Sequence, residues 1–351
     1  MTTRIGDNIY EPSTDNKLYG RFPLGNAIVS KPKGMYASEG YAIPAVTTHA
    51  ELHGMLIGTT WSDIETSEGV YDFSAIECKL NGYNYNGGVC TGTGTSANSV
   101  RTLGLNWSLA IACGPNTPDY IKDNVAVDLL TYTWIGGAEF TTPYVWDSYV
   151  QTKYAAMIAA VGAQYASDPT LVLVYVSQFG QNGNEGLLPK SLVGTTWATL
   201  GFVDADYISG TLANVDACIA AFPFKPIALE LHDFADISTA GDTYVTDSLL
   251  STFETDLDYI DRVGVGMWWI DGDTDYQAQL ITDLTAFTGN IYAQVIGQSG
   301  TPERFPSGYA AVYTQAKTIG IEYIEAWNHE YDVGIAPTWD ATFNDFNAWS
   351  A

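Results

Sequence analysis

The feature that most limits the fold is a regular alternation of short apolar runs with longer amphipathic segments. The apolar runs are rich in β-branched residues and stop at Gly, Pro or polar residues, as buried strands do. We predict strands at residues 33–37, 54–61, 105–113, 171–177, 226–232, 262–269, 290–297 and 320–327. We predict helices that start near residue 74 and that span residues 146–165, 206–222, 247–259, 275–287, 308–319 and about 341–349.

Eight strands with alternating helices in a chain of 351 residues fit an α/β fold, a closed (β/α)8 TIM barrel, better than an open sheet. No composition break divides residues 31–351, so we expect one barrel domain with long loops after its strands. Residues 1–30 contain Pro and Gly at irregular spacing and are expected to form an N-terminal arm. Glycine-rich phosphate loops of the GxGxxG or GxxxxGK[ST] type are absent, which removes the main support for nucleotide binding.

The charge balance excludes some partners. Lys and Arg number 14 against 40 Asp and Glu, so the formal net charge is −26. This acidic chain would be repelled by a nucleic-acid backbone and by an anionic membrane surface. No apolar stretch reaches the ~18 residues of a membrane span, and the polar N-terminus shows no signal peptide.

The cysteines and histidines give little support for a metal centre. The four cysteines form no CxxC pair, and only four histidines are present, so we expect no metal and no cofactor. Cys78 and Cys90 flank a loop rich in Gly and Asn, where either a disulfide or two free thiols would fit. Cys113 and Cys218 lie in apolar contexts that are typical of core residues.

Glu185 is the first candidate for catalysis. The strand predicted at 171–177 ends in a loop of glycines and amides, Gln178 to Gly186, in which Glu185 is the carboxylate. In α/β barrels the loops that follow the strands carry the active site. We therefore take Glu185 as the centre of the expected site.

Two further carboxylates are expected inside the barrel. Strand residues alternate between the interior and the helix layer, and the aliphatic residues of the fifth strand should face the helices. Glu230 and His232 then point inward, as do Glu325 and Trp327 in the eighth strand. A buried carboxylate is costly unless it is paired or functional, so each is either catalytic or a structural or substrate-binding group.

Three segments carry a resemblance to a known family. They are Trp61-Ser-Asp-Ile-Glu65 with Glu68-Gly-Val-Tyr-Asp-Phe-Ser74, then Cys113-Gly-Pro-Asn-Thr-Pro-Asp119, then Asn184-Glu185. They resemble, distantly, segments after the second, third and fourth strands of clan A-type (β/α)8 glycoside hydrolases, the β-galactosidase-like and cellulase-like barrels. The resemblance implies a TIM barrel, a general acid/base role for Glu185, and structural roles for Glu65 and Glu68.

The sequence differs from this family in the position of the second catalytic carboxylate. The family's nucleophile is a Glu that ends the seventh strand, whereas residues 290–297 here offer Gln294, followed by Gln298. We expect Glu325 to replace it, with Glu230 as the next candidate. Such a pair would cleave a glycosidic bond, one carboxyl as proton donor and the other as nucleophile or base.

Aromatic and amide side chains near the strand ends are candidates for sugar binding. Aromatic rings stack on the apolar face of a sugar, and amides and imidazoles bind hydroxyls. Adjacent strand residues face opposite ways, so only one of Trp268 and Trp269 should reach the site. The full set is Trp61, Asn184, His232, Trp268, Trp269, Tyr292, Gln294, Trp327 and Asn328.

These observations predict a glycoside hydrolase that acts on a poly- or oligosaccharide. The alternative is a catalytically inactive carbohydrate-binding barrel on a particle or cell surface, which the missing seventh-strand Glu favours. Either protein would act outside the cell or on a virus or other particle. A metal-dependent barrel enzyme has the weakest support, because no pair of histidines has metal-ligand spacing.

Overall fold

The computed structural model describes residues 29–38, 51–124, 126–134, 137–332 and 334–351. In these residues eight parallel strands close into a barrel in the order β1-β14-β13-β12-β11-β10-β7-β2. The strands are β1 (Gly34–Ser38), β2 (Leu52–Thr60), β7 (Asn106–Ala112), β10 (Leu171–Tyr175), β11 (Ile227–Glu230), β12 (Val263–Ile270), β13 (Ile291–Val295) and β14 (Tyr323–Trp327). The predicted (β/α)8 fold and its eight strands are confirmed; the predicted arm lies almost wholly outside the described residues.

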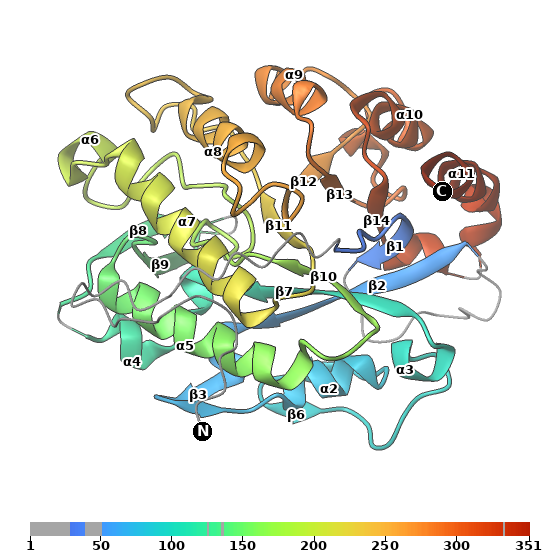
Figure 1. Cartoon of the computed structure of the whole chain (residues 1–351), viewed down its shortest axis with the longest axis horizontal. Helices are drawn as coiled ribbons and strands as arrows, with labels where there is room; N and C mark the ends of the chain where they lie inside the picture. The colour runs from blue at the N-terminus through green and yellow to red at the C-terminus, as the bar shows by residue number, and fades with distance from the viewer. Residues whose placement is uncertain (1–28, 39–50, 125, 135–136, 333) are drawn as a thin grey trace, which may run out of the picture.

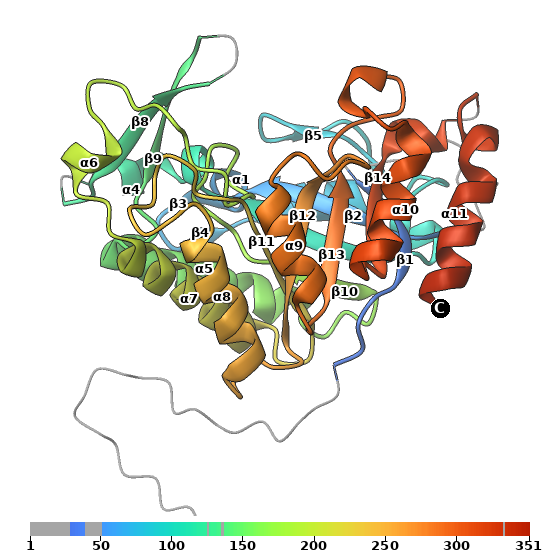
Figure 2. The same cartoon turned by 90° about the horizontal axis from the view of Figure 1, so that it is seen from above.

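Helices surround the barrel on its outside (Figures 1 and 2). The longer ones are α2 (Ser74–Leu80), α5 (Ser148–Tyr165), α7 (Asp204–Ala221), α8 (Tyr244–Thr255), α9 (Ala278–Ala286), α10 (Tyr309–Ile319) and α11 (Ala336–Ser350). Asp147 caps α5, since its carboxylate accepts from the N–H groups of Tyr149 and Val150. The helix predicted to start near residue 74 begins at Ser74, whose N–H and hydroxyl both donate to Asp72.

Two apolar layers follow from the alternation of strand residues. The outer layer lies between strands and helices and contains Ile227, Leu229 and Leu231 of the fifth strand and its extension. The inner layer fills the barrel. Its apolar members are Tyr36, Leu56, Ala110, Leu173, Tyr175, Ala228, Trp268, Tyr292 and Tyr323. The predicted inward side of the fifth strand is therefore confirmed.

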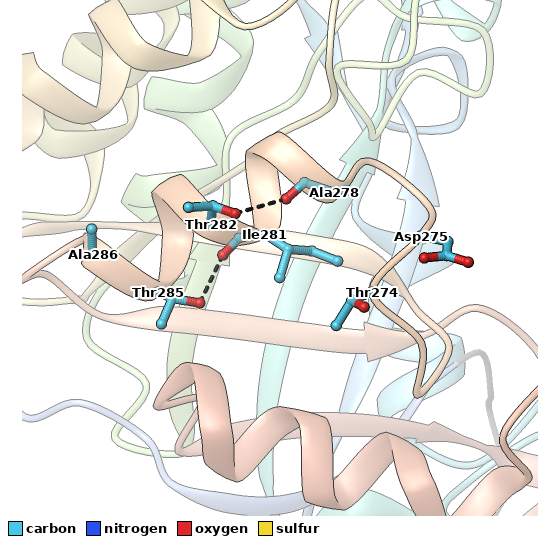
Figure 3. A pocket seen from close by; sticks show the side chains of 7 residues that line it. All are labelled: Thr274, Asp275, Ala278, Ile281, Thr282, Thr285 and Ala286. Atoms are coloured by element: carbon cyan, nitrogen blue, oxygen red, sulfur yellow. Dashed lines mark hydrogen bonds between the residues drawn. The ribbon is translucent and has the colours of Figure 1, made fainter.

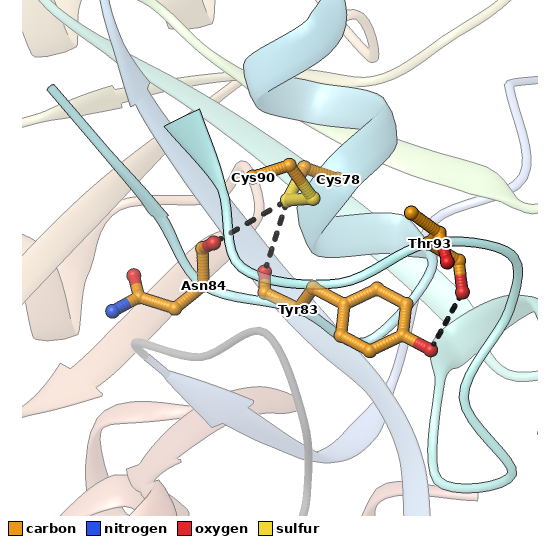
Figure 4. The surroundings of a disulfide bond; sticks show 5 residues. All are labelled: Cys78, Tyr83, Asn84, Cys90 and Thr93. Atoms are coloured by element: carbon orange, nitrogen blue, oxygen red, sulfur yellow. Dashed lines mark hydrogen bonds between the residues drawn. A yellow bond between two sulfur atoms is a disulfide. The ribbon is translucent and has the colours of Figure 1, made fainter. Parts of the chain in front are cut away.

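The segment between α2 and β7 is more ordered than a plain loop. It forms a small hairpin of β5 (Tyr85–Asn86) and β6 (Val89–Cys90). Cys78 on α2 and Cys90 form a disulfide with a Cα–Cα distance of 5.8 Å, which joins the hairpin to the helix (Figure 4). The sequence left open a disulfide or two free thiols at Cys78 and Cys90, and the structure has the disulfide. Cys113 and Cys218 are buried free thiols, as expected.

A second hairpin supports the loop that carries Glu185. It consists of β8 (Leu129–Thr133) and β9 (Glu139–Pro143), after β7. The hydroxyl of Tyr132 donates to the main-chain oxygen of Gln181 at 2.7 Å, and that of Thr142 donates to Phe179 at 3.2 Å. The hairpin thus fixes the loop from outside the barrel.

The helices of the described residues are too short or too polar to cross a membrane.

Candidate active site

The loop after β10 positions Glu185 through main-chain contacts. The side chain of Asn182 accepts hydrogen bonds from the N–H groups of Asn184 and Glu185, at 3.0 and 2.9 Å. Gly183 has a φ of +81°, and a Cβ there would lie 2.3 Å from the main-chain oxygen of Cys113. Only glycine fits this conformation and this close approach. The loop is therefore held against the end of β7, and the Glu185 side chain remains 18% exposed.

Glu230 ends β11 and is 1% exposed. Its Oε2 accepts a hydrogen bond of 2.8 Å from the N–H of Gly186, the residue after Glu185. In the other direction, the amide of Gln178 donates to the main-chain oxygen of Glu230 at 2.6 Å. The loop and the fifth strand are thus tied together beside the two carboxylates.

The pKa of Glu230 is raised well above its ordinary value. Burial is the main cause, because it disfavours the charged carboxylate, and the nearby charge of Glu185 adds to it. The hydrogen bond from Gly186 acts in the opposite sense but does not cancel these effects. Burial and the charge of Glu185 therefore both favour the protonated form of Glu230.

His232 lies between the two carboxylates. Its Nε2 is 3.4 Å from Oε2 of Glu185 and 3.3 Å from Oε1 of Glu230. The geometry of neither contact makes a hydrogen bond, so Nε2 of His232 and Oε1 of Glu230 are buried without a hydrogen-bond partner. One ligand atom from each of the three residues lies within 4.8 Å of the others. Three chemically active groups therefore converge where β10 and β11 end.

Glu325 lies inside the barrel, as predicted, but outside this cluster. It is 0% exposed, and both of its oxygens accept hydrogen bonds. The donors are the hydroxyls of Ser108, Tyr175 and Tyr323 and the amide of Gln294. Burial raises its pKa to about 7, while these donors limit the rise. The geometry favours Glu230 over Glu325 as the partner of Glu185, the reverse of the order expected from the sequence.

The tryptophans take different positions. Trp268 faces the barrel interior, with its ring 4.9 Å from that of Tyr175. Trp269 faces the other way, donates to the main-chain oxygen of Leu231 at 2.9 Å, and has its ring 5.9 Å from that of His232. Trp269 is therefore the one that borders the carboxylates.

Trp61 does not reach the strand-end opening, contrary to expectation. It begins a short helix, α1 (Trp61–Ile64), and is 0% exposed in the outer core. Its indole donates to Glu65 at 2.8 Å, and Glu65 also accepts from Tyr120 and from the N–H of Gly69. These contacts agree with the structural role expected of Glu65. The α1 turn rotates the tryptophan into the core.

The remaining sugar-binding candidates are spread over the barrel. Tyr292 and Gln294 lie in its interior, and the amide of Gln294 donates a hydrogen bond to Glu325. Trp327 is partly exposed and donates to the main-chain oxygen of Val295 at 2.7 Å. Asn184 and Asn328 are also partly exposed, next to Glu185 and after β14 respectively.

Sequence reasoning missed Tyr276. It was assigned to the helix at 275–287, whereas α9 begins at Ala278 and Tyr276 lies in the preceding loop. Its side chain is 43% exposed, its ring is 5.6 Å from that of Trp269, and burial together with nearby Asp233, Glu185 and Glu230 raises its pKa to about 12. Tyr276 follows the sixth barrel strand, and this position in the sequence was the signal that could have identified it as a site residue.

A surface groove of about 570 Å³ runs along α9 and the loop before it (Figure 3). Its lining is Thr274, Asp275, Ala278, Ile281, Thr282, Thr285 and Ala286. Within α9, the hydroxyls of Thr282 and Thr285 donate to main-chain oxygens one turn earlier. The groove belongs to the helix layer, and the carboxylate cluster does not line it.

The cluster has the parts required for acid and base catalysis. The pKa of one carboxyl, Glu230, is raised by burial, and the other, Glu185, is partly exposed beside it. An oxygen of Glu185 lies no more than 4.8 Å from an oxygen of Glu230. Glycosidases that retain configuration place their carboxyls ~5–5.5 Å apart, and inverting ones ~6.5–9.5 Å. The closest oxygens of Glu185 and Glu230 approach at least as near as in the shorter of these ranges.

Comparisons with known proteins agree on the fold. No family model and no curated protein sequence matches this chain. The structure of a cold-adapted β-galactosidase from Rahnella sp. R3 matches with a TM-score of 0.58 at 10% identity, over 92% of this chain and 57% of that one. The β-galactosidase from the psychrophilic Marinomonas ef1 matches with a TM-score of 0.51 at 10% identity, over 84% and 53%. This chain thus spans little more than half the length of those two enzymes.

The catalytic domain of the major endoglucanase from Xanthomonas campestris pv. campestris is also similar, with a TM-score of 0.49 at 13% identity, over 91% of this chain and 95% of that one. The two β-galactosidases match most of this chain, whose described residues form a closed ring of eight parallel strands. The chain therefore has the fold of the clan A-type (β/α)8 glycoside hydrolases.

Proposed function

We propose that this protein hydrolyses glycosidic bonds with Glu185 and Glu230 as its catalytic pair. The observation that carries the proposal is their contact geometry: two carboxylates within 4.8 Å, with Glu230 buried and its pKa raised, and Glu185 partly exposed. Glu230 donates the proton to the leaving oxygen, and Glu185 acts as nucleophile or as base toward water. This reverses the role that the resemblance implies for Glu185.

The proposed substrate is a poly- or oligosaccharide. Trp269 and Tyr276 form an aromatic edge beside the carboxylates, and Tyr276 is exposed enough to stack on a sugar ring. Asn184 is a hydroxyl-binding group next to Glu185. The acidic chain suits a neutral glycan, and we propose that it acts outside the cell or on a particle.

One observation favours the second candidate, a barrel that binds carbohydrate without cleaving it. The seventh strand, β13, carries Gln294, whose amide donates to Glu325 at 2.9 Å. An amide held in this way does not provide the nucleophile that the family has at the end of this strand. The aromatic edge at Trp269 and Tyr276 would then serve binding alone.

Aryl glycosides with good and poor leaving groups test the proposal and its roles. Glu230→Gln should lose activity on poor leaving groups and retain it on a dinitrophenyl glycoside, which needs no proton donor. Glu185→Gln should lose activity on both. If the two variants show the opposite pattern, the roles are exchanged.

Glu68→Gln is the matched control, because Glu68 is exposed and pairs with Lys153 on the outside. It should keep wild-type activity. If the wild-type protein releases no sugar from a broad glycan panel yet binds glycans, the binding protein replaces the hydrolase.

A further inference from the structure

His232 has an unusual environment for a buried histidine. The residue is 2% exposed, yet Nε2 makes no hydrogen bond. Instead it points at two carboxylate oxygens, Oε2 of Glu185 at 3.4 Å and Oε1 of Glu230 at 3.3 Å. A buried polar atom without a partner is rare and costly, which indicates that a further group belongs between these atoms.

The distances match the ligand shell of a small divalent cation. Ligand atoms bound tetrahedrally at ~2.0–2.1 Å lie about 3.3–3.4 Å from one another. The two contacts of His232 have these values, and the Glu185 to Glu230 separation is at most 4.8 Å. A modest side-chain rotation of Glu185, the most exposed of the three, is the adjustment needed.

The chemistry of the three groups selects the cation. One imidazole and two carboxylates are hard-to-borderline ligands that suit Zn²⁺ and similar transition metals. Ca²⁺ requires six to eight oxygens, which this buried cluster does not offer. A dication between two acids also removes the repulsion that they exert on each other.

We propose that Glu185, Glu230 and His232 form a Zn²⁺-binding site whose occupancy blocks the catalytic pair. The part that concerns blocking rests on the proposed hydrolase function; the part that concerns binding does not. With both carboxylates bound to the cation, neither a proton donor nor a nucleophile is left for a glycosidic bond. The cation is thus an inhibitor at the centre of the site.

Binding is tested on the full-length protein without substrate. Co²⁺ should give the intense visible absorption of a four-coordinate site, and Zn²⁺ should displace it at one ion per chain. His232→Gln and Glu185→Gln should each weaken Zn²⁺ binding at least tenfold in competition with a chromophoric chelator. Glu185→Gln keeps the test valid if the buried histidine variant does not fold, since its side chain is partly exposed.

Control variants distinguish Zn²⁺ binding at this cluster from binding at other side chains. His53→Gln and His329→Gln change histidines outside the cluster and should leave Zn²⁺ affinity unchanged. A thiolate-to-cobalt band would place the ion on Cys113 or Cys218 and overturn the proposal. So would Zn²⁺ binding that is equal in wild type and in both cluster variants.

Hydrolysis provides the second measurement. Zn²⁺ should suppress sugar release by the wild-type protein, and a chelator should restore it. If the protein hydrolyses glycans and Zn²⁺ leaves the rate unchanged, the proposed blocking is refuted. If Zn²⁺ binds with the expected variant effects but no glycan is cleaved, the metal site stands and the hydrolase proposal fails.

Discussion

Replacing Glu325 with glutamine is expected to flatten the dependence of folding stability on pH. Burial raises the pKa of Glu325 to about 7, against an ordinary value of 4.5. Between these values the folded protein holds a proton that the unfolded chain has released. Its stability therefore falls as the pH rises through this window, and the Glu325 contribution is lost above pH 7.

The size of the effect follows from the shift. Each pKa unit corresponds to about 1.4 kcal/mol, so the free energy of unfolding should fall by roughly 2–3 kcal/mol between pH 5 and pH 8 through Glu325 alone. Glu325→Gln has no proton to lose, and its amide oxygen still accepts from the hydroxyls of Ser108, Tyr175 and Tyr323. The stability difference between wild type and variant should change by that amount across this range.

Urea unfolding at several pH values measures this difference. Glu303→Gln is the control, since Glu303 is exposed in a short 3-10 turn, and its profile should follow the wild type. If the Glu325→Gln profile also runs parallel to the wild type, Glu325 is not the group that titrates near neutral pH, and the burial argument is refuted.

Three further outcomes are expected. Cys78→Ser should lower the free energy of unfolding by up to about 3 kcal/mol, because it removes the disulfide. A reductant should then lower the unfolding temperature of the wild type but not that of the variant. An equal shift in both proteins would contradict this role of the disulfide. Gly183→Ala should reduce activity and stability, because its Cβ meets a main-chain oxygen at 2.3 Å. Gly194→Ala, also at positive φ but in open space, should cost less in thermal unfolding. Tyr276→Ala should raise KM for a glycan and Tyr276→Phe should not, if the ring stacks on sugar; equal kinetics in both would exclude stacking.

The alternation of residue types was enough to predict the barrel and the inward side of its strands. The aliphatic residues at 227, 229 and 231 placed Glu230 and His232 inside, and the structure agrees. This works because a parallel strand buried on both faces still separates bulky aliphatic groups from polar ones.

The partner of Glu185 was not predictable in the same way. Its contact with Glu230 depends on the path of the loop, which is set by the Asn182 side chain and by the close packing of Gly183 on Cys113. Such non-local contacts leave no periodic pattern in the sequence. Trp61 illustrates the same limit, since a single helical turn directed it into the core.

The hydrogen bond from the N–H of Gly186 to Glu230 has a consequence for how the chain tolerates change. One acid is anchored by the peptide unit next to the other acid, so the main chain sets the spacing of the two residues from which the carboxylates extend. Substitutions in the more exposed segment after Pro189 can accumulate without altering that spacing. By the same logic, one inserted residue between Glu185 and Gly186 would shift Glu185 away from Glu230 without replacing any side chain of the site.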